Sequence, residues 1–449
     1  MSYVGSGAGK GAGDKGLRFS LFETLRLAWA DEDLRGRLQF IIMILTIYVV
    51  GVNIAVPVPG ISPTAIEELV KNNPVFQLIN ALGGGAFKRI SIFALGLNPY
   101  IVASIILQVL TYGNPKWKEE MKEGGEYARR QQNRRTRILT IVLAFAQGYG
   151  LMTAMGSAIS EVLPAYRFMI VLFWTAGSMF LLWLGEQVSE RGVGNGISIL
   201  IFTGIIISLP SILGTLGAGL AGGNIAIWQI VALIALFFAT TWFIVLFTVA
   251  QRRIPIQHMR RNFGTKAMGG QVSYLPIAVA MAGVIPIIFA ITLIYLPAQF
   301  QAWFPVDSAG HRILGEIAGF MNPDFTRWQG YVGALIYMGM IFFFTYFWTA
   351  LQYNVEDIAD NLKKGGSYIQ GIRPGRQTRD YLNGVVSRIT FIGAVFLAIA
   401  ALTQFVLPLV VQAQGIGLIA GTSLLIMVSV ALETMRQLEA NLITKQYEG

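Results

Sequence analysis

The sequence predicts an all-α integral membrane protein with ten membrane-spanning helices, and three observations lead to this class. Of the 449 residues, 54% are hydrophobic and only 13% are charged, with a mean hydropathy of +0.58, whereas a soluble chain carries about 25% charged residues. Long stretches of the chain contain no charge, and the basic residues concentrate in alternate loops. Together these observations exclude an ordinary soluble multidomain protein and an intrinsically disordered chain.

Ten stretches are long and apolar enough to cross a bilayer, which takes about 20 residues. None of them contains Asp, Glu, Lys or Arg. They are Leu38–Pro59, Ser91–Tyr112, Ile138–Gly156, Phe168–Gly185, Ile197–Ala221, Ile225–Ala250, Leu275–Phe304, Gly330–Tyr353, Ile389–Gln414 and Gly415–Leu432. Residues 1–37 are predicted to be a tail with an amphipathic segment and no cleavable signal peptide, and residues 433–449 a second tail.

The basic residues predict the orientation of these spans. Ten spans place both termini on one side, and the loops of that side hold 28 of the 34 Lys and Arg residues. The positive-inside rule therefore places both termini in the cytoplasm. The same rule accounts for the formal net charge of +10 without nucleic acid as a partner. Three long cytoplasmic loops, at 113–137, 251–274 and 354–388, carry most of this charge.

The residue types exclude most chemistry. The chain has no cysteine and only two histidines, His258 and His311, both in predicted loops. Proton- and ion-coupled transporters generally place ionisable side chains inside the bilayer. The ten spans contain no Asp, Glu, Lys or Arg, which disfavours this class of transporter. The glycine-rich run Gly192–Gly196 opens a membrane helix and does not follow a strand, so it is not a nucleotide-binding loop. We expect no enzymatic activity, no cofactor and no metal.

Helix-breaking residues mark spans two and seven. A Gly-rich stretch precedes span two, which itself carries Gly96 and Pro99, and span seven carries Pro286 and Pro297. Two related halves of five spans have opposite orientations, so residues 38–221 and 225–432 are expected to form an inverted repeat. Interrupted helices at matching positions point to a central path between the halves. This pattern alone leaves a solute transporter and a channel equally open.

Several strings of residues, in order and at consistent spacing, resemble the SecY family of protein-conducting channels over nearly the whole chain, from about Leu38 to Tyr447. The strings are Pro57–Gly60, Ser91–Ile101, Trp183–Gln187, Glu190–Ser198, Met281–Pro286, Ala359–Lys364, Gly371–Gly375 and Gly421–Ile426. The resemblance makes an inverted-repeat solute transporter remote. It leaves a specialised accessory member, or an inactive scaffold, as the remaining alternative to a housekeeping channel.

The resemblance implies an hourglass pore between the two halves, through which unfolded secretory preproteins cross the membrane. It also implies a lateral gate between spans two and seven, which releases apolar segments and signal sequences into the lipid bilayer. The implied partners are SecE, SecG, the motor ATPase SecA and the ribosome, with no DNA. The implied location is a bacterial plasma membrane.

Site residues follow from the resemblance by motif position. The pore ring would comprise Leu97, Ile101, Ile197, Ile201, Ile288 and Ile426. The plug would be Ile79–Arg89, centred on Leu82, Gly83, Gly84, Gly85, Ala86 and Phe87. The lateral gate would include Gln147, Ala280 and Pro286. The loops that dock SecA or the ribosome would present Arg252, Arg253, Arg260, Arg261 and Arg373.

Two positions depart from the family pattern. Ala280 stands where bacterial members usually carry an Asn of the gate's polar cluster, and Gln147 remains as the other member. Our hypothesis is that this change shifts the hydrophobicity that a signal sequence needs to open the gate. Val49 and Val50 lie where an Arg is common, and nothing in the sequence accounts for that change. For Arg376 and Arg379, positive-inside charge alone is a sufficient reason.

Overall fold

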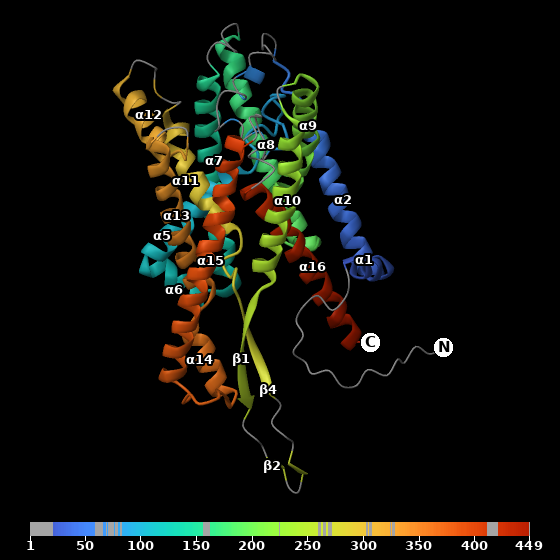
Figure 1. The fold of residues 1–449 in the computed structure, drawn as a ribbon, viewed down its shortest axis with the longest axis vertical. Coiled ribbons are helices and arrows are strands. Elements are labelled where there is room, and N and C mark those ends of the chain that lie inside the picture. Colours follow the sequence, from blue (N-terminus) through green and yellow to red (C-terminus); the bar gives the residue numbers. More distant parts are fainter. Residues whose placement is uncertain are drawn as a thin grey trace.

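The protein is an elongated helical bundle, seen in a computed structural model (Figure 1). The structure describes residues 21–58, 66–68, 70, 76, 80, 83–155, 162–223, 225–258, 262–263, 266–267, 272–301, 304, 308–323, 325, 328–410 and 421–448. Long helices run along the long axis, and a β-hairpin projects from one end.

The first half of the described chain is helical. Its helices are α1 Leu21–Ala30, α2 Glu32–Val52, α5 Asn98–Gly113, α6 Pro115–Glu123, α7 Gly125–Ala154, α8 Pro164–Arg191 and α9 Gly196–Ala221. Side chains cap several of these helices: Asp31 accepts a hydrogen bond from Leu34 N at the start of α2, and Asn195 accepts from Ile197 N at the start of α9. Such caps satisfy amide groups that the first helical turn leaves unpaired.

The second half adds further helices and a small sheet. The helices are α10 Ile227–Val249, α11 Ile285–Gln301, α12 Ala309–Met321, α13 Trp328–Gln352, α14 Val355–Lys364, α15 Arg376–Val410 and α16 Thr422–Glu448. The strands are β1 Gln251–His258, β2 Asn262–Phe263, β3 Lys266–Ala267, β4 Val272–Ala278 and β5 Ser367–Ile369.

Each predicted span overlaps one long helix of the described chain. Seven of these helices, α2, α7, α8, α9, α10, α13 and α15, are long and apolar enough to cross a membrane. The other three depart from that criterion, because α5 has 16 residues, α11 has 17, and α16 carries charged residues in its second half. The all-α membrane fold predicted from the sequence is therefore present.

The predicted start of span two is too early. Ser91 forms an isolated β-bridge, Ile92–Leu97 forms turns, and α5 begins only at Asn98. Gly96 has a φ of +57°, a left-handed conformation that ends a regular helix, and Pro99 occupies the first turn of α5. Of the predicted tenth span, residues 415–420 lie outside the described residues, and α16 begins at Thr422.

The predicted start of span seven is also too early. Leu275–Ala278 belongs to strand β4, a turn follows, and α11 begins at Ile285. Strand β4 pairs antiparallel with β1, in a register that runs from Gln251 opposite Ala278 to Gln257 opposite Val272. The ladder satisfies the backbone groups of this apolar stretch, so a helix is not required there.

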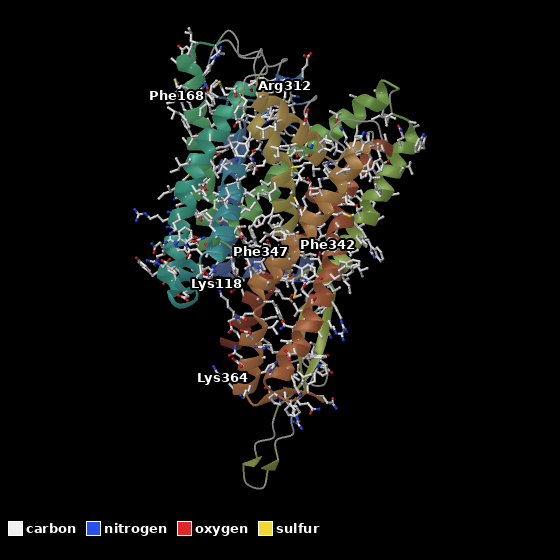
Figure 2. All side chains as sticks on the ribbon, turned by 90° about the vertical axis from the view of Figure 1, so that its left-hand side faces the viewer. Lys118, Phe168, Arg312, Phe342, Phe347 and Lys364 are labelled. Atoms are coloured by element: carbon white, nitrogen blue, oxygen red, sulfur yellow. The ribbon has the colours of Figure 1, made fainter. Side chains whose placement is uncertain are left out.

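The loops segregate to the two ends of the bundle. Helices α1 and α14, the β1–β4 hairpin and the chain's last residues lie toward the lower end in Figure 1, whereas α12 lies at the upper end. Figure 2 places Lys118 and Lys364 in the lower half and Phe168 and Arg312 near the top. The loops that the sequence assigns to the basic side thus lie toward one end.

Two of the basic loops fold together at that end. Strand β1 pairs with β4 on one edge and with β5 on the other, so the three strands form one sheet of order β4-β1-β5. Ile254, Ile277 and Ile369 of these strands are buried against Leu382 and Val386 of α15. The loop at 251–274 and the loop at 354–388 are therefore parts of one folded unit.

Candidate channel, plug and gate

Two cavities meet at a neck in the centre of the bundle. The larger, with a volume of about 560 Å³, is lined on one side by the turn before α11 and on another by α16. The smaller, of about 40 Å³, includes Gly83 among its lining residues. Three isoleucines line both cavities and therefore separate them: Ile101 of α5, Ile201 of α9 and Ile288 of α11.

The other residues expected in the pore ring lie next to this neck. Leu97 and Ile426 line the smaller cavity, and Ile197 lines the larger one. Four helices and the turn before α5 thus bring the six side chains to the walls of these two adjoining cavities. Ile101, Ile201 and Ile426 are buried, with 7%, 7% and 4% of their surface exposed. Such branched apolar side chains have few rotamers and can close a narrow passage to water and ions.

Polar side chains line part of each cavity. The smaller cavity presents Asn98, Thr292, Gln299 and Thr422. The larger one presents Gln108, Asn195, Gln352, Glu433 and Arg436, among others. Arg436 donates a hydrogen bond to the carbonyl oxygen of Thr248 at 3.2 Å. Glu433 and Arg436 were not singled out in the sequence, since nothing in the chain's order places this turn of α16 beside a cavity.

The described part of the expected plug from Gly83 to Arg89 is a series of turns packed beside the neck. Of its central residues, Leu82 lies outside the described residues, and Gly83–Phe87 form turns. Ala86 and Phe87 are fully buried. The Phe87 ring lies 6.3 Å from that of Trp174 in α8, measured between ring centres. These contacts place the segment inside the bundle, where it adjoins the smaller cavity through Gly83.

Hydrogen bonds attach the stretch after the plug to its neighbours. The Ser91 hydroxyl donates to the Gly51 carbonyl at 2.9 Å, and the Ser178 hydroxyl donates to the Gly96 carbonyl at 2.9 Å. The backbone of Ser91 also pairs with that of Ala55 in an isolated bridge. Because both serines are buried, these bonds form where water does not compete. They hold the base of α5 against α2 and α8.

The expected gate residues occupy three different places. Helices α5 and α11 face each other across the smaller cavity, and Pro286 is buried in the first turn of α11. Ala280 lies in the turn before α11 and lines the larger cavity. Gln147 lies in α7, and its buried amide oxygen has no hydrogen-bond partner among the described residues. It is not among the residues lining either cavity, so the structure does not join it to Ala280.

The expected docking arginines lie on the folded unit of the two basic loops. Arg252 and Arg253 are exposed on β1, while Arg260 and Arg261 lie outside the described residues. Arg373 is exposed between Gly371 and Gly375, which have φ values of +79° and +103°. Its carbonyl accepts a hydrogen bond from the Thr378 hydroxyl at 2.9 Å. The sheet brings the loops of Arg252 and Arg373 together, which the sequence did not predict.

The first basic loop uses much of its charge internally. Arg137 donates two hydrogen bonds to Glu186 of α8, at 2.9 and 2.7 Å. Arg135 pairs with Glu120 at 3.3 Å and lies 4.4 Å above the ring of Trp117. These contacts fasten α6 and the start of α7 to the bundle. They make this loop a less available docking surface than the other two.

A helical bundle with a central apolar neck, a buried Gly-rich segment beside it and basic loops at one end is the architecture expected of a polytopic membrane channel. Known proteins specify it further. The SecY family model matches residues 91–435. A protein translocase subunit SecY from Pseudomonas aeruginosa is 41% identical over 424 residues, covering 93% of each chain, and one from Staphylococcus carnosus is 39% identical over 445 residues, 96% of this chain and 99% of that protein. The chain belongs to the SecY family.

Solved structures have the same fold. A structure described as that of a protein-conducting channel covers 92% of this chain and 93% of its own, with a TM-score of 0.66 and 20% identity. Sec61 in a canine ribosome-channel complex covers 92% of this chain and 93% of its own, with a TM-score of 0.62 and 19% identity. SecY is a family of channel subunits and not of enzymes.

Proposed function

We propose that this chain forms the pore of a protein-conducting channel that passes unfolded secretory polypeptides across the membrane. The observation that carries the proposal is the neck of Ile101, Ile201 and Ile288 between two partly polar cavities. A polypeptide would enter the larger cavity, pass the isoleucines and displace the plug. Membership of the SecY family supports the same function, because the relatives are named protein translocase subunits.

The neck allows a wide range of sequences to pass without loss of the ion barrier. The ring makes no directional bonds, so it does not select particular side chains. When the channel is empty, a narrow apolar passage excludes water and therefore ions. The plug, packed through Phe87, adds a second barrier beside the neck. No step of this process requires a catalytic group on this chain.

Helices α5 and α11 form the proposed lateral gate. An apolar segment in the pore would leave between them when its transfer to lipid is favourable. Each Leu or Ile at the centre of such a segment contributes about 0.3–0.6 kcal/mol to that transfer. A string of these residues therefore determines whether the segment enters the membrane or is exported.

Partner proteins supply the driving force in this proposal. The exposed Arg252 and Arg373, on one folded unit, suit acidic protein surfaces or the phosphates of ribosomal RNA, because a guanidinium binds both through paired hydrogen bonds. The SecA motor and the ribosome are the corresponding partners. A Sec61 relative has been described in a ribosome-channel complex. SecE and SecG would pack against the outside of the helical bundle.

The proposed setting is a bacterial plasma membrane with both termini in the cytoplasm. The basic loops lie at the end of the bundle that also carries α1 and the end of α16 (Figure 1). Residues 38–221 and 225–432 would be the two inverted halves, with cytoplasmic segments at 1–37 and 433–449.

Protease protection of a secretory precursor tests this function. Proteoliposomes would contain the chain with SecE, and SecA, ATP and the precursor would be added. We expect ATP-dependent protection that Arg373→Glu abolishes and Arg376→Glu, a matched exposed arginine in the same loop, largely retains. Absence of protection with SecE and SecA bound would contradict the proposal. Solute flux through the same vesicles would then test the transporter alternative.

A further inference from the structure

The β1–β4 hairpin is joined directly to α11 by a short linker, residues 279–284. Its ladder begins at Gln251, two residues after α10 ends, and closes at Ala278. The Val279 amide extends the ladder by donating to the Ala250 carbonyl at 2.9 Å. A continuous paired ribbon thus runs from residues 257 and 272 of the hairpin to Val279, with no loop to absorb movement before the linker.

Helix α15 contacts this linker at Gly393, and we call this contact and the one described next the two seats of the linker. Gly393 of α15 lies so close that a Cβ atom there would be 2.6 Å from the Val279 carbonyl oxygen. Real Cβ atoms do not approach backbone oxygen atoms this closely, so position 393 admits the linker only as glycine. The same helix is buried against the sheet of the hairpin through Leu382 and Val386. The hairpin and its linker therefore rest on one support.

Helix α13 provides a second seat through Gln352. With its amide oriented to satisfy both groups, Gln352 donates to the Met281 carbonyl at 3.1 Å and accepts from the Trp348 indole N–H at 3.1 Å. Gln352 lines the larger cavity and is exposed to it. Water can therefore replace its bond to Met281 when the linker moves, which makes this contact reversible.

A pivot lies just beyond these two seats. Gly283 has a φ of +60°, and the space around its missing Cβ is open. Two residues later α11 begins, and Ile288, one turn into it, is part of the neck. A displacement of the linker would therefore change the position of α11 relative to α5.

We propose that Gln352 and Gly393 are positioning residues that hold the 279–284 linker in place, so that loss of either contact displaces α11 relative to α5. The inference rests on the proposed channel function and adds which contacts set the resting position of α11. This displacement should occur without a docked partner.

The test uses the chain assembled with SecE in proteoliposomes. The variants are Gly393→Ala, which forces the linker off α15, and Gln352→Met, which removes its bond at nearly constant side-chain length. Gly384→Ala is the matched control for the first, because it lies in the same helix and its Cβ would meet no atom within 4 Å. Trp348→Phe removes the indole N–H that orients the Gln352 amide and keeps an aromatic ring beside Phe289 of α11.

Two readouts separate gating from folding and from docking. The chain has no cysteine, so spin labels placed by Val109→Cys on α5 and Leu293→Cys on α11 report the distance between the two helices. SecA binding is measured on the same samples. We expect Gly393→Ala and Gln352→Met to change this distance without SecA, with resting ion conductance raised about threefold or more and SecA affinity unchanged. Trp348→Phe should show a smaller change of the same sign.

Three results would overturn the proposal: distances in both variants equal to those of Gly384→Ala, a loss of SecA affinity without a change in distance, or conductance that rises only on adding SecA. Wild-type translocation is measured first in the same vesicles. Its failure would reject the channel function itself, and so would be distinguished from a failure of the linker mechanism.

Discussion

Gly84 in the proposed plug lies directly against Gly204 of α9: a Cβ atom at position 84 would be 3.3 Å from the Gly204 carbonyl oxygen and 3.4 Å from its Cα atom. The backbone at Gly84 is also left-handed, with a φ of +67°. The plug is therefore seated by a close approach of two glycine backbones. Neighbouring Gly85, with a φ of +83°, has open space around its missing Cβ.

This relationship predicts that Gly84→Ala loosens the plug. A non-glycine residue in the left-handed region costs roughly 1–2 kcal/mol, and contact with Gly204 adds to that cost. Such an energy changes the ratio of seated to displaced plug by about 5- to 30-fold. We expect resting channels in planar bilayers to conduct ions more often.

Gly85→Ala is the control for this prediction, since it has the backbone cost without the contact. Its leak should exceed that of the wild type and remain below that of Gly84→Ala. Equal leaks in the two variants would show that the approach to Gly204 plays no part in seating the plug.

The neck predicts a different defect at Ile201. Ile201→Ser exchanges a branched apolar side chain that borders both cavities for a small polar one, so water should enter the neck. We expect a larger ion current through channels that hold an arrested polypeptide, where the plug is already displaced. The ion current should rise severalfold in Ile201→Ser. Ile101→Ser should raise it by a similar factor.

Ile205→Ser is the matched control, one turn further along α9 and buried with 2% exposed surface, but not lining either cavity. It should lower the free energy of unfolding by about 2–5 kcal/mol, as other replacements of a large apolar core residue by a small one do. It should not increase the current. A similar current in both variants would contradict the assignment of Ile201 to the seal.

The sequence was sufficient to predict where the long helices lie and in what order, because an uncharged apolar run of membrane length is rarely anything but a membrane helix. It was not sufficient for their internal structure. Leu275–Ala278 is as apolar as the helix that follows, and only its pairing with Gln251–Ile254 shows it to be a strand. That partner lies more than twenty residues earlier in the chain.

For the candidate site too, the sequence predicted the residues but not their contacts. Motifs indicated which isoleucines to examine, but a neck exists only where α5, α9, α11 and α16 come together. The contact between Gln352 and Met281 joins α13 to the linker before α11, and no local pattern predicts it. Likewise, Arg137 and Glu186 are 49 positions apart, so the sequence did not predict their ion pair. From the sequence, Arg137 was only one of the basic residues of the first loop.

Ala280 predicts an altered threshold for signal sequences. Ala280→Asn adds hydrogen-bonding groups to the wall of the larger cavity, beside the Met281 carbonyl that Gln352 holds. Extra polar contacts favour the closed gate, so we expect a more apolar signal to be required. Insertion of a series of signals with stepwise Leu content measures the shift, which should be about one to three Leu residues, or roughly 0.3–2 kcal/mol.

Ala278→Asn is the control, because it adds the same side chain to the same cavity within strand β4. It should change the threshold less than Ala280→Asn does. An unchanged selectivity in Ala280→Asn would refute the hypothesis that position 280 contributes to gate opening.

An ion-pair cluster fastens the end of α16 to the junction of α1 and α2. Lys445 lies 2.7 Å from an Asp31 carboxyl oxygen and 3.2 Å from one of Asp33. The backbone amide of Leu34 and then Lys445 lower the pKa of Asp31, the hydrogen bond from Lys445 chiefly lowers the pKa of Asp33, and the hydrogen bond to Asp31 chiefly raises the pKa of Lys445. The cluster joins the start of α2 to the end of α16.

The directions of these shifts fix the pH range in which the cluster stabilises docking of α16. Asp31 and Asp33 have lowered pKa values in the folded protein. Their contribution to the free energy of α16 docking is therefore complete above about pH 4–5, beyond the ordinary Asp pKa of about 3.9. It is lost as the pH falls through the lowered pKa values. The lysine has a raised pKa, so its contribution is complete below the ordinary value of about 10.4 and is lost as the pH rises through the raised one.

Lys445→Met should therefore increase amide hydrogen exchange in the last turns of α16 at pH 7, and the increase should be smaller near pH 3, below the ordinary Asp pKa of about 3.9. Because these side chains are partly exposed, the increase should be small and the unfolding temperature nearly unchanged. Lys364→Met, the same charge change at the end of α14, is the control and should leave α16 exchange unaltered. If Lys445→Met raised exchange equally at pH 3 and pH 7, loss of packing by the lysine stem, and not loss of the ion pairs, would be responsible.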